Sequence, residues 1–142
     1  MGVYYWFADF TNKRYIDGYA AKSQEWRGSQ FDQAMVVNYL MDKNQEQIEV
    51  KFASDESGEW DEIAAQKFED YTCDNIYSMF ENGYFNSYTE KVWIGNIRWI
   101  LDKFSRENKL DLYLKIASEI PQFMKQYKET ICDTLEVLNR IS

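Results

Sequence analysis

The sequence predicts an α+β fold, because strand-like segments gather near its beginning and helical periodicity fills its second half. Residues 3–10 and 15–21 are rich in aromatic and other strand-favouring side chains, and residues 47–53 alternate between apolar and polar. From residue 87 onward, apolar residues recur every three or four positions. We therefore expect a small N-terminal β-hairpin and a third strand with helices, followed by a helical C-terminal half.

These elements are expected to form one domain. A chain of 142 residues that is 45% hydrophobic is long enough for a single core. Charge nevertheless divides it, since residues 1–86 carry 16 acidic and 7 basic side chains and residues 87–142 carry 8 and 9. We expect a single domain over residues 1–142, in which an acidic α+β part (1–86) and a helical part (87–142) share one core.

The predicted hairpin has aromatic side chains on both faces of its first strand. On one face lie Tyr4, Trp6 and Phe10, and on the other Tyr5 and Phe7. A polar turn at 11–14 leads to the second strand. A strand that is apolar on both faces is usually central in its sheet or covered on both sides.

A helix and a third strand follow the hairpin. Ser29 stands three residues before Asp32, a weak form of the capping pattern that opens a helix, and Asn44 is a plausible end. The expected buried positions of this helix are Phe31, Met35, Tyr39 and Leu40. In the next strand, alternation assigns one half-buried face to Ile48, Val50 and Phe52 and the other to Glu49 and Lys51.

The most informative stretch is the acidic segment 55–81. It contains nine of the 24 acidic residues and one of the 16 basic ones, Lys67, so its charge of −8 equals that of the whole chain. We predict an amphipathic helix capped by Ser54 or Ser57, with a kink or break between residues 72 and 75. Residues 82–83 are expected to form its C-cap, and a hairpin turn joining residues 77–80 to 84–88 is the alternative. Its expected apolar face comprises Trp60, Ile63, Ala64, Phe68 and Tyr71.

The C-terminal half reads as helices. Residues 87–90 form an S-x-x-E capping box, residues 110–117 a shorter helix, and Pro121 suits the first turn of a last helix. The stripe after the capping box comprises Trp93, Ile97, Ile100, Leu101 and Phe104. The last stripe comprises Met124, Tyr127, Ile131, Leu135, Leu138 and Ile141. We expect this last stripe to pack in the core, and a homodimer seam is the alternative.

Most catalytic chemistry is missing from the sequence. There is no histidine, which excludes Ser-His-Asp and Cys-His catalysis and HExxH zinc sites. The six glycines form neither a dinucleotide fingerprint nor a P-loop. Cys73 and Cys132 are isolated and are expected to be small core residues. We therefore expect no enzymatic activity and no cofactor.

A divalent metal site is not expected either. When the EF-hand loop is aligned to begin at Asp55, Trp60 occupies the position that requires glycine and Gln66 the position of the final glutamate. A looser Mg²⁺ or Ca²⁺ site among Asp55, Glu59 and Asp61 is the alternative.

The net charge also limits the classes of partner that the protein can bind. A net charge of −8 argues against direct binding to nucleic acid or to an anionic membrane, and it favours a basic protein partner. Two isolated cysteines suit the reduced cytosol, and no apolar run reaches the 18 residues of a membrane span.

Carboxylates on a rigid helix can stand in for phosphates. We therefore expect a non-enzymatic protein that acts as a nucleic-acid mimic and occupies the basic, nucleic-acid-binding surface of a partner. Small acidic proteins of phages and mobile elements, including anti-CRISPR inhibitors, have this general profile. The expected partner-binding residues are Asp55, Glu56, Glu59, Asp61, Glu62, Glu69, Asp70 and Asp74.

Two other functions fit the same sequence. An immunity or antitoxin-like protein would use its carboxylates to neutralise a basic toxin. A generic interaction domain would carry them as a solvated face, and carboxylates in a first helical turn also stabilise the positive end of the helix.

Overall fold

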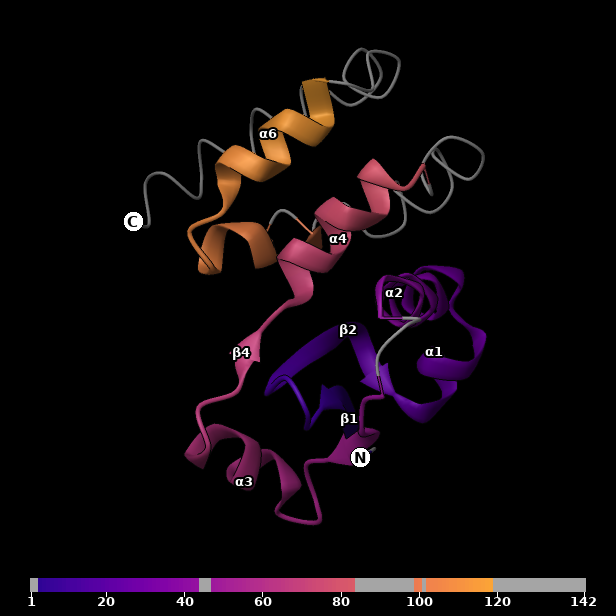
Figure 1. Cartoon of the computed structure of the whole chain (residues 1–142), viewed down its shortest axis with the longest axis vertical. Helices are drawn as coiled ribbons and strands as arrows, with labels where there is room; N and C mark the ends of the chain where they lie inside the picture. Colours follow the sequence, from indigo (N-terminus) through magenta and orange to yellow (C-terminus); the bar gives the residue numbers. More distant parts are fainter. Residues whose placement is uncertain (1–2, 44–46, 84–98, 101, 119–142) are drawn as a thin grey trace. The chain divides into compact units, whose positions relative to one another are not determined.

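A four-stranded mixed sheet is the centre of the first part of the protein. In the computed structural model (Figure 1), the strands follow the order β3-β1-β2-β4. β1 pairs antiparallel with β2 and β3, and β2 pairs parallel with β4. The strands are β1 (Tyr4–Asp9), β2 (Arg14–Lys22), β3 (Val50–Ser54) and β4 (Glu69–Asp70). Because helices accompany this mixed sheet, the predicted α+β class is confirmed.

The structure describes residues 3–43, 47–83, 99–100 and 102–118. The chain divides into two compact units, Met1–Met79 and Phe80–Ser142. That residues 1–142 form one domain with one shared core stays a prediction. Within the described ranges, each helix is too short or too polar to cross a bilayer.

The predicted hairpin and its central first strand are confirmed. β1 lies between β2 and β3, so both of its hydrogen-bonding edges are paired. On one face the ring of Phe7 meets Tyr39 of α2 (Gln30–Asp42), with 6.0 Å between ring centroids. On the other face Trp6 stacks on Trp60 of α3 (Glu59–Ala65) at 4.0 Å. Successive side chains of a strand point to opposite faces, so α2 and α3 lie on opposite sides of the sheet.

The helix α1 (Ser23–Gly28) precedes α2 in the chain and packs against β2. Its Trp26 is buried and donates a hydrogen bond from Nε1 to the carbonyl oxygen of Tyr5 at 3.0 Å. The indole lies so close to Gly18 of β2 that a Cβ there would stand 2.9 Å from Trp26 Cζ2. The absence of a side chain at Gly18 is therefore what allows Trp26 to pack on the sheet.

The start of α2 is where the sequence predicts it. Ser29 is the N-cap, and its hydroxyl oxygen accepts a hydrogen bond from the Asp32 backbone N–H at 3.4 Å. Phe31, Met35 and Tyr39 are buried as expected. Leu40 is 40% exposed, so its assignment to the core was wrong; it lies about 100° around the helix from Tyr39. The expected end at Asn44 lies outside the described residues.

The predicted faces of β3 are partly wrong. Val50 and Phe52 are 37% and 41% exposed, whereas Ala53, on the other face, is fully buried. The reason is that β3 is an edge strand, and α3 covers the face that carries Ala53. Trp60 Nε1 there donates to the Ala53 carbonyl oxygen at 2.7 Å. Phe52 is still covered on one side, where its ring lies 5.2 Å from that of Phe7, measured between the ring centroids.

The predicted long acidic helix is wrong. The segment instead forms α3, β4 and α4 (Thr72–Glu81), and the break lies at residues 66–71 rather than 72–75. Neither Ser54 nor Ser57 caps α3; its N-cap is Gly58, in the left-handed region with φ 79°. The described end of α4 agrees with the predicted C-cap, because Gly83 has φ 80° and donates to Phe80 O at 3.1 Å.

Lys67 ends α3. Its φ of 57° is left-handed, its N–H donates to Ala64 O at 3.1 Å, and the Phe68 N–H donates to Ile63 O at 3.2 Å. These two bonds are the pair that defines a Schellman motif. Its usual apolar contact is present too, because Phe68 and Ile63 belong to one buried cluster. Ala64, which was expected to be buried, is exposed on α3.

In the second unit, α6 (Leu110–Ser118) confirms the predicted helix at 110–117. Of the stripe expected before it, Ile100 and Phe104 are buried, and the Phe104 ring meets Tyr113 edge-on at 5.9 Å. The other predictions for this half concern residues outside the described ranges: Ser87–Glu90, Trp93, Ile97, Leu101, Pro121 and the stripe at 124–141.

Candidate functional site

A stack of three aromatic rings holds α3 on the sheet. The indole rings of Trp60 and Trp6 lie 4.0 Å apart and within 7° of parallel, and Tyr15 stacks on the far side of Trp6 at 4.2 Å. The bond from Trp60 Nε1 to Ala53 O and the burial of Ile63 add to this attachment. The short helix therefore presents its outer face on a well-packed base.

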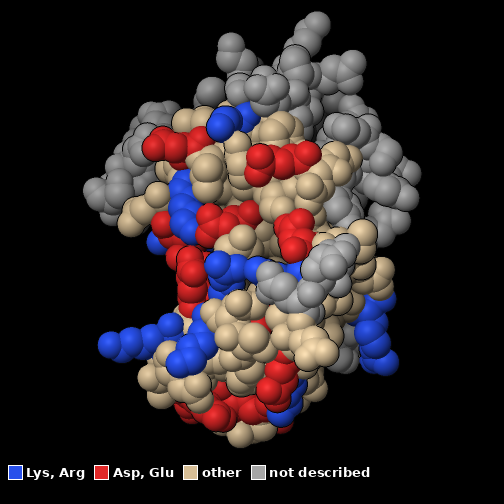
Figure 2. Space-filling model, viewed as in Figure 1, with Lys and Arg blue, Asp and Glu red and all other residues tan. Residues whose placement is uncertain are grey.

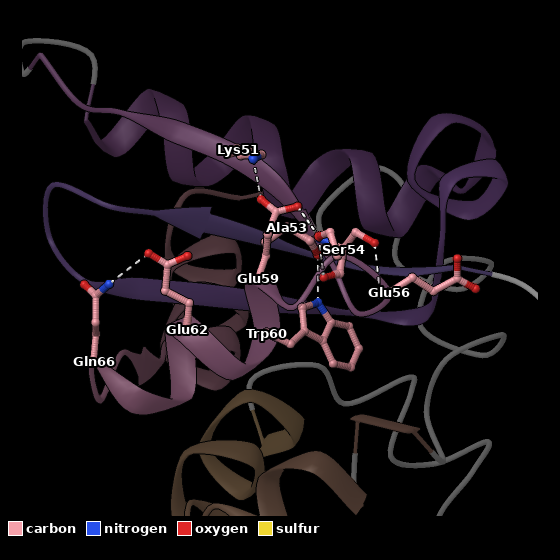
Figure 3. A network of polar contacts seen from close by, with 9 residues as sticks. Lys51, Ala53, Ser54, Glu56, Glu59, Trp60, Glu62 and Gln66 are labelled. Carbon is pink, nitrogen blue, oxygen red and sulfur yellow. Dashed lines mark hydrogen bonds and ion pairs between the residues drawn. The ribbon is translucent and has the colours of Figure 1, made fainter.

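Glu59, the first residue of α3, is engaged within the molecule. Its carboxylate accepts hydrogen bonds from Ser57 Oγ at 2.5 Å and from the Ser54 N–H at 3.4 Å, and it forms an ion pair with Lys51 (Figure 3). The hydrogen bonds from Lys51 and then Ser57 hold the pKa of Glu59 below its ordinary value. This predicted site residue joins α3 to β3.

Three more of the predicted site residues belong to the frame of the fold. Asp55 accepts from the Tyr4 N–H at 3.0 Å, which extends the pairing of β1 with β3. Asp70 accepts from Thr72 N–H and Oγ at 3.1 and 2.7 Å, immediately before α4. Asp74 lies half-buried in the first turn of α4, where a carboxylate stabilises the positive end of the helix.

Glu69 is exposed on β4, but a cation lies beside it. Its carboxylate is 3.9 Å from Arg14 Nε, and the Arg14 guanidinium also lies 4.3 Å from the centre of the Tyr71 ring. The positive charge of Arg14 offsets the field of Glu69 locally. The β4 end of the acidic stretch is therefore a weaker attraction for a basic partner than its sequence indicates.

Glu56, Asp61 and Glu62 remain as exposed carboxylates, and we call these three the α3 acidic surface. Acidic side chains gather at the bottom of the view in Figure 2, where Figure 1 shows α3. Figure 3 shows Glu56 directed away from the Glu59 network. Gln66 Nε2 donates to Glu62 Oε1 at 3.3 Å, a contact that leaves the charge in place. Within the described ranges, none of the three forms an ion pair.

The residues considered for a metal site do not converge. Asp55 is bonded to Tyr4 and Glu59 to Lys51, while Asp61 lies on the exposed side of α3. Over the part of the chain that the structure describes, no group of three or more His, Cys, Asp or Glu side chains could hold a metal ion. Cys73 is buried in α4, as expected of a small core residue, and Cys132 lies outside the described residues.

Comparison with known proteins adds no relative. The chain matches no protein-family model, no curated protein and no solved structure.

Sequence reasoning missed a buried polar cluster at the hairpin turn. Asp9 is only 1% exposed, and its carboxylate accepts hydrogen bonds from the Tyr39 hydroxyl, the Asn12 side-chain amide at 2.7 Å and the backbone N–H groups of Thr11 and Asn12, each at 3.0 Å. An aspartate at the start of a turn is a known sequence signal, because its carboxylate can accept hydrogen bonds from the backbone N–H groups that follow it in the turn. The contribution of Tyr39 is visible only in three dimensions.

Proposed function

We propose that the protein is a non-enzymatic binding protein whose α3 acidic surface occupies a basic, nucleic-acid-binding surface of a cytoplasmic partner. The observation that carries this proposal is a set of three exposed carboxylates, two on a helix fixed by stacked indoles and one in the turn that precedes it. Intramolecular pairing neutralises other acids of the segment, notably Glu59 and Glu69, but not these three.

Rigid attachment favours such a role. A binding surface that is already ordered loses little conformational entropy when a partner docks, so more of the interaction energy remains as affinity. The carboxylates also raise the association rate, because complementary charge steers the encounter. A net charge of −8 works in the same direction at longer range.

Within this class we favour an inhibitor from a phage or mobile element, such as an anti-CRISPR protein. An RNA-guided nuclease holds its heteroduplex in a positively charged channel and reads it through backbone geometry. Carboxylates presented on a helix are suited to compete for such a channel.

The test begins by identifying proteins that bind the full chain at low salt and leave it at high salt. Each is then assayed for binding to labelled DNA or RNA, or to guide RNA and target for an RNA-guided nuclease, with and without this protein. The expected result is a nucleic-acid-binding partner from which the protein displaces the nucleic acid. Partners that bind no nucleic acid, or bind it undisturbed, would contradict the proposal.

Charge reversals then locate the surface. Glu56→Lys, Asp61→Lys and Glu62→Lys should each slow association with the partner and weaken its salt dependence, because each removes an attractive charge from the encounter. Glu69→Lys makes the same change of charge on β4, outside the α3 acidic surface, and should have a smaller effect.

Val37→Lys is the matched control for added positive charge. Val37 is 47% exposed on α2, on the opposite side of the sheet from α3. It should leave association nearly unchanged, and circular dichroism should show that every variant is folded. Val37→Lys adds one unit of positive charge and Glu62→Lys adds two, so an effect of Val37→Lys that is half that of Glu62→Lys would mean that only net charge matters and that α3 is not the binding surface.

A further inference from the structure

The outer edge of β3 has backbone groups that the sheet does not use. Phe10 N–H donates to Glu49 O at 2.8 Å and Asp55 N–H donates to Tyr4 O at 3.0 Å, so residues 49 and 55 face β1. In an antiparallel pair, alternate residues turn their N–H and C=O groups to opposite sides. Ile48, Val50 and Phe52 therefore point these groups outward. Among the described residues, none lies beyond β3 in the strand order.

One end of this edge is closed. The outward N–H of Ser54 is bonded to Glu59 Oε1 at 3.4 Å, so the open stretch runs from residue 48 to residue 53. The opposite edge of the sheet is protected differently. β4 has only two residues, Glu69 and Asp70, and both are acidic, so a second β4 would be repelled.

We propose that the β3 edge pairs antiparallel with β3 of a second copy of this chain, about a two-fold axis at Val50. In that register each Glu49 lies opposite Lys51 of the other copy, and each Ile48 lies opposite Phe52 of the other copy. Opposite charges directly across two strands stabilise the pair. The outward groups of residues 48, 50 and 52 become hydrogen-bonded, which continues the sheet from one copy into the other.

Charge selects this register over its neighbours. An axis at Lys51 would set the two lysines opposite each other, and an axis at Glu49 would do the same with the two glutamates. An axis at Phe52 would place Glu49 opposite Asp55 and would require the N–H of Ser54, which Glu59 already binds. Like charges directly opposite destabilise strand pairing, so the axis at Val50 is the favourable one.

The same register accounts for the exposed apolar side chains of β3. Val50 and Phe52 are 37% and 41% exposed, and they share one face of the strand with Ile48. Pairing about Val50 would join the two sets into one continuous apolar stripe. A second copy of β3 therefore suits this edge, because the charged and apolar positions of the strand are self-complementary.

The experiment measures the mass of the full chain in solution by light scattering over a range of concentrations. The unaltered protein should approach twice the 17.0 kDa of one chain. Glu49→Lys places lysines opposite lysines and should weaken the dimer on the order of tenfold or more. Lys51→Glu should do the same by opposing two glutamates.

The decisive experiment mixes these two variants in equal amounts. In a mixed dimer every lysine again lies opposite a glutamate, so dimers should return although each variant alone is weakened. Lys51→Glu also removes the ion pair with Glu59, so its fold is checked by circular dichroism. Val50→Pro is independent of charge: it deletes an outward N–H and leaves the pairing with β1 intact, and it should give a folded monomer.

Glu56→Lys is the matched control, since it makes the same change of charge away from this edge and should leave the dimer intact. A monomer at every concentration would overturn the proposal. So would a dimer that resists both Glu49→Lys and Val50→Pro, because another surface would then hold it. Dimerisation and partner binding are separated by these variants, because Glu49 is not part of the α3 acidic surface.

Discussion

Replacing Tyr39 by Phe tests the buried cluster at the hairpin turn. The Tyr39 hydroxyl donates a hydrogen bond to the Asp9 carboxylate, and both side chains are at most 2% exposed. Burial and the neighbouring Asp9 carboxylate both raise the pKa of Tyr39, so the hydroxyl stays protonated and continues to donate. The substitution removes that donor while the aromatic ring remains.

The expected loss of stability follows from the charge of the acceptor. A hydrogen bond to a charged group contributes about 1.5–3 kcal/mol to stability. Losing the Tyr39 hydroxyl also leaves the buried Asp9 carboxylate with one donor fewer, which lowers the stability of the folded state. We expect the free energy of unfolding, measured by urea denaturation at neutral pH, to fall by about 1.5–3 kcal/mol. Asp9 keeps its bonds from Thr11 and Asn12, so the hairpin turn should survive.

The effect should depend on pH in a defined direction. Burial by itself would raise the pKa of Asp9, but the hydrogen bonds from Tyr39, Asn12 and Thr11 outweigh it and hold the pKa below the ordinary value of 3.8. A lowered pKa stabilises the fold above the ordinary value, and this contribution is lost as pH falls through the folded-state pKa. The difference between the wild type and Tyr39→Phe should therefore shrink as the pH is lowered below that value.

Tyr71→Phe is the matched control, because it removes a hydroxyl from a half-buried tyrosine whose ring lies 5.9 Å from that of Tyr39. In the described structure that hydroxyl forms no hydrogen bond, so the change should alter stability by less than about 0.5 kcal/mol. A loss for Tyr39→Phe that is equally small, or that is constant from neutral to acid pH, would refute the proposed bond to a charged Asp9.

Three further substitutions test the packing, each followed by urea denaturation. Gly18→Ala should destabilise by about 1–3 kcal/mol, because its Cβ would stand 2.9 Å from Trp26 Cζ2; an unchanged midpoint would show that the indole can move away. Lys67→Gly should stabilise by about 0.5–1 kcal/mol, since Gly adopts the left-handed conformation at φ 57° without strain, and a loss of stability would contradict the assigned turn. Ile63→Ala should destabilise by about 2–5 kcal/mol, whereas Ala64→Ser on the exposed side should change little; similar effects would mean that α3 is packed differently.

The sequence predicts the parts of the fold that local patterns determine. The hairpin, the capping of α2 by Ser29 and the helix at 110–117 each depend on residues a few positions apart, and all three are present. The class of the fold follows from the order of such elements. Patterns of this kind need no knowledge of distant contacts.

The acidic segment was predicted less well because its decisive residue gives no local signal. A helix commonly ends with Gly or Asn in the left-handed conformation, but Lys67 occupies that position. What favours the turn is the burial of Phe68 with Ile63 against the sheet, and that depends on Ala8 and Ala53 far away in sequence. The predicted faces of β3 were misjudged similarly, since alternation does not reveal which face α3 covers.

The candidate site shows the same limit. Eight carboxylates are equivalent by sequence, but the structure engages Asp55, Glu59 and Asp70 in the frame and places Arg14 beside Glu69. Only three-dimensional pairing distinguishes a carboxylate that supports the fold from one that faces solvent.

The central place of β1 has a consequence for the order in which the chain folds. Trp6 pairs with Asp17 in the hairpin but also with Ala53, 47 positions later. Closing the larger loop costs about 1 kcal/mol more, since each doubling of loop length adds about 0.6 kcal/mol. The hairpin can therefore form while the ribosome is still adding residues beyond 22, with one side of β1 open until β3 is made. During that interval an apolar strand is exposed to other nascent chains, so early association with a chaperone would protect the protein most at this stage of its synthesis.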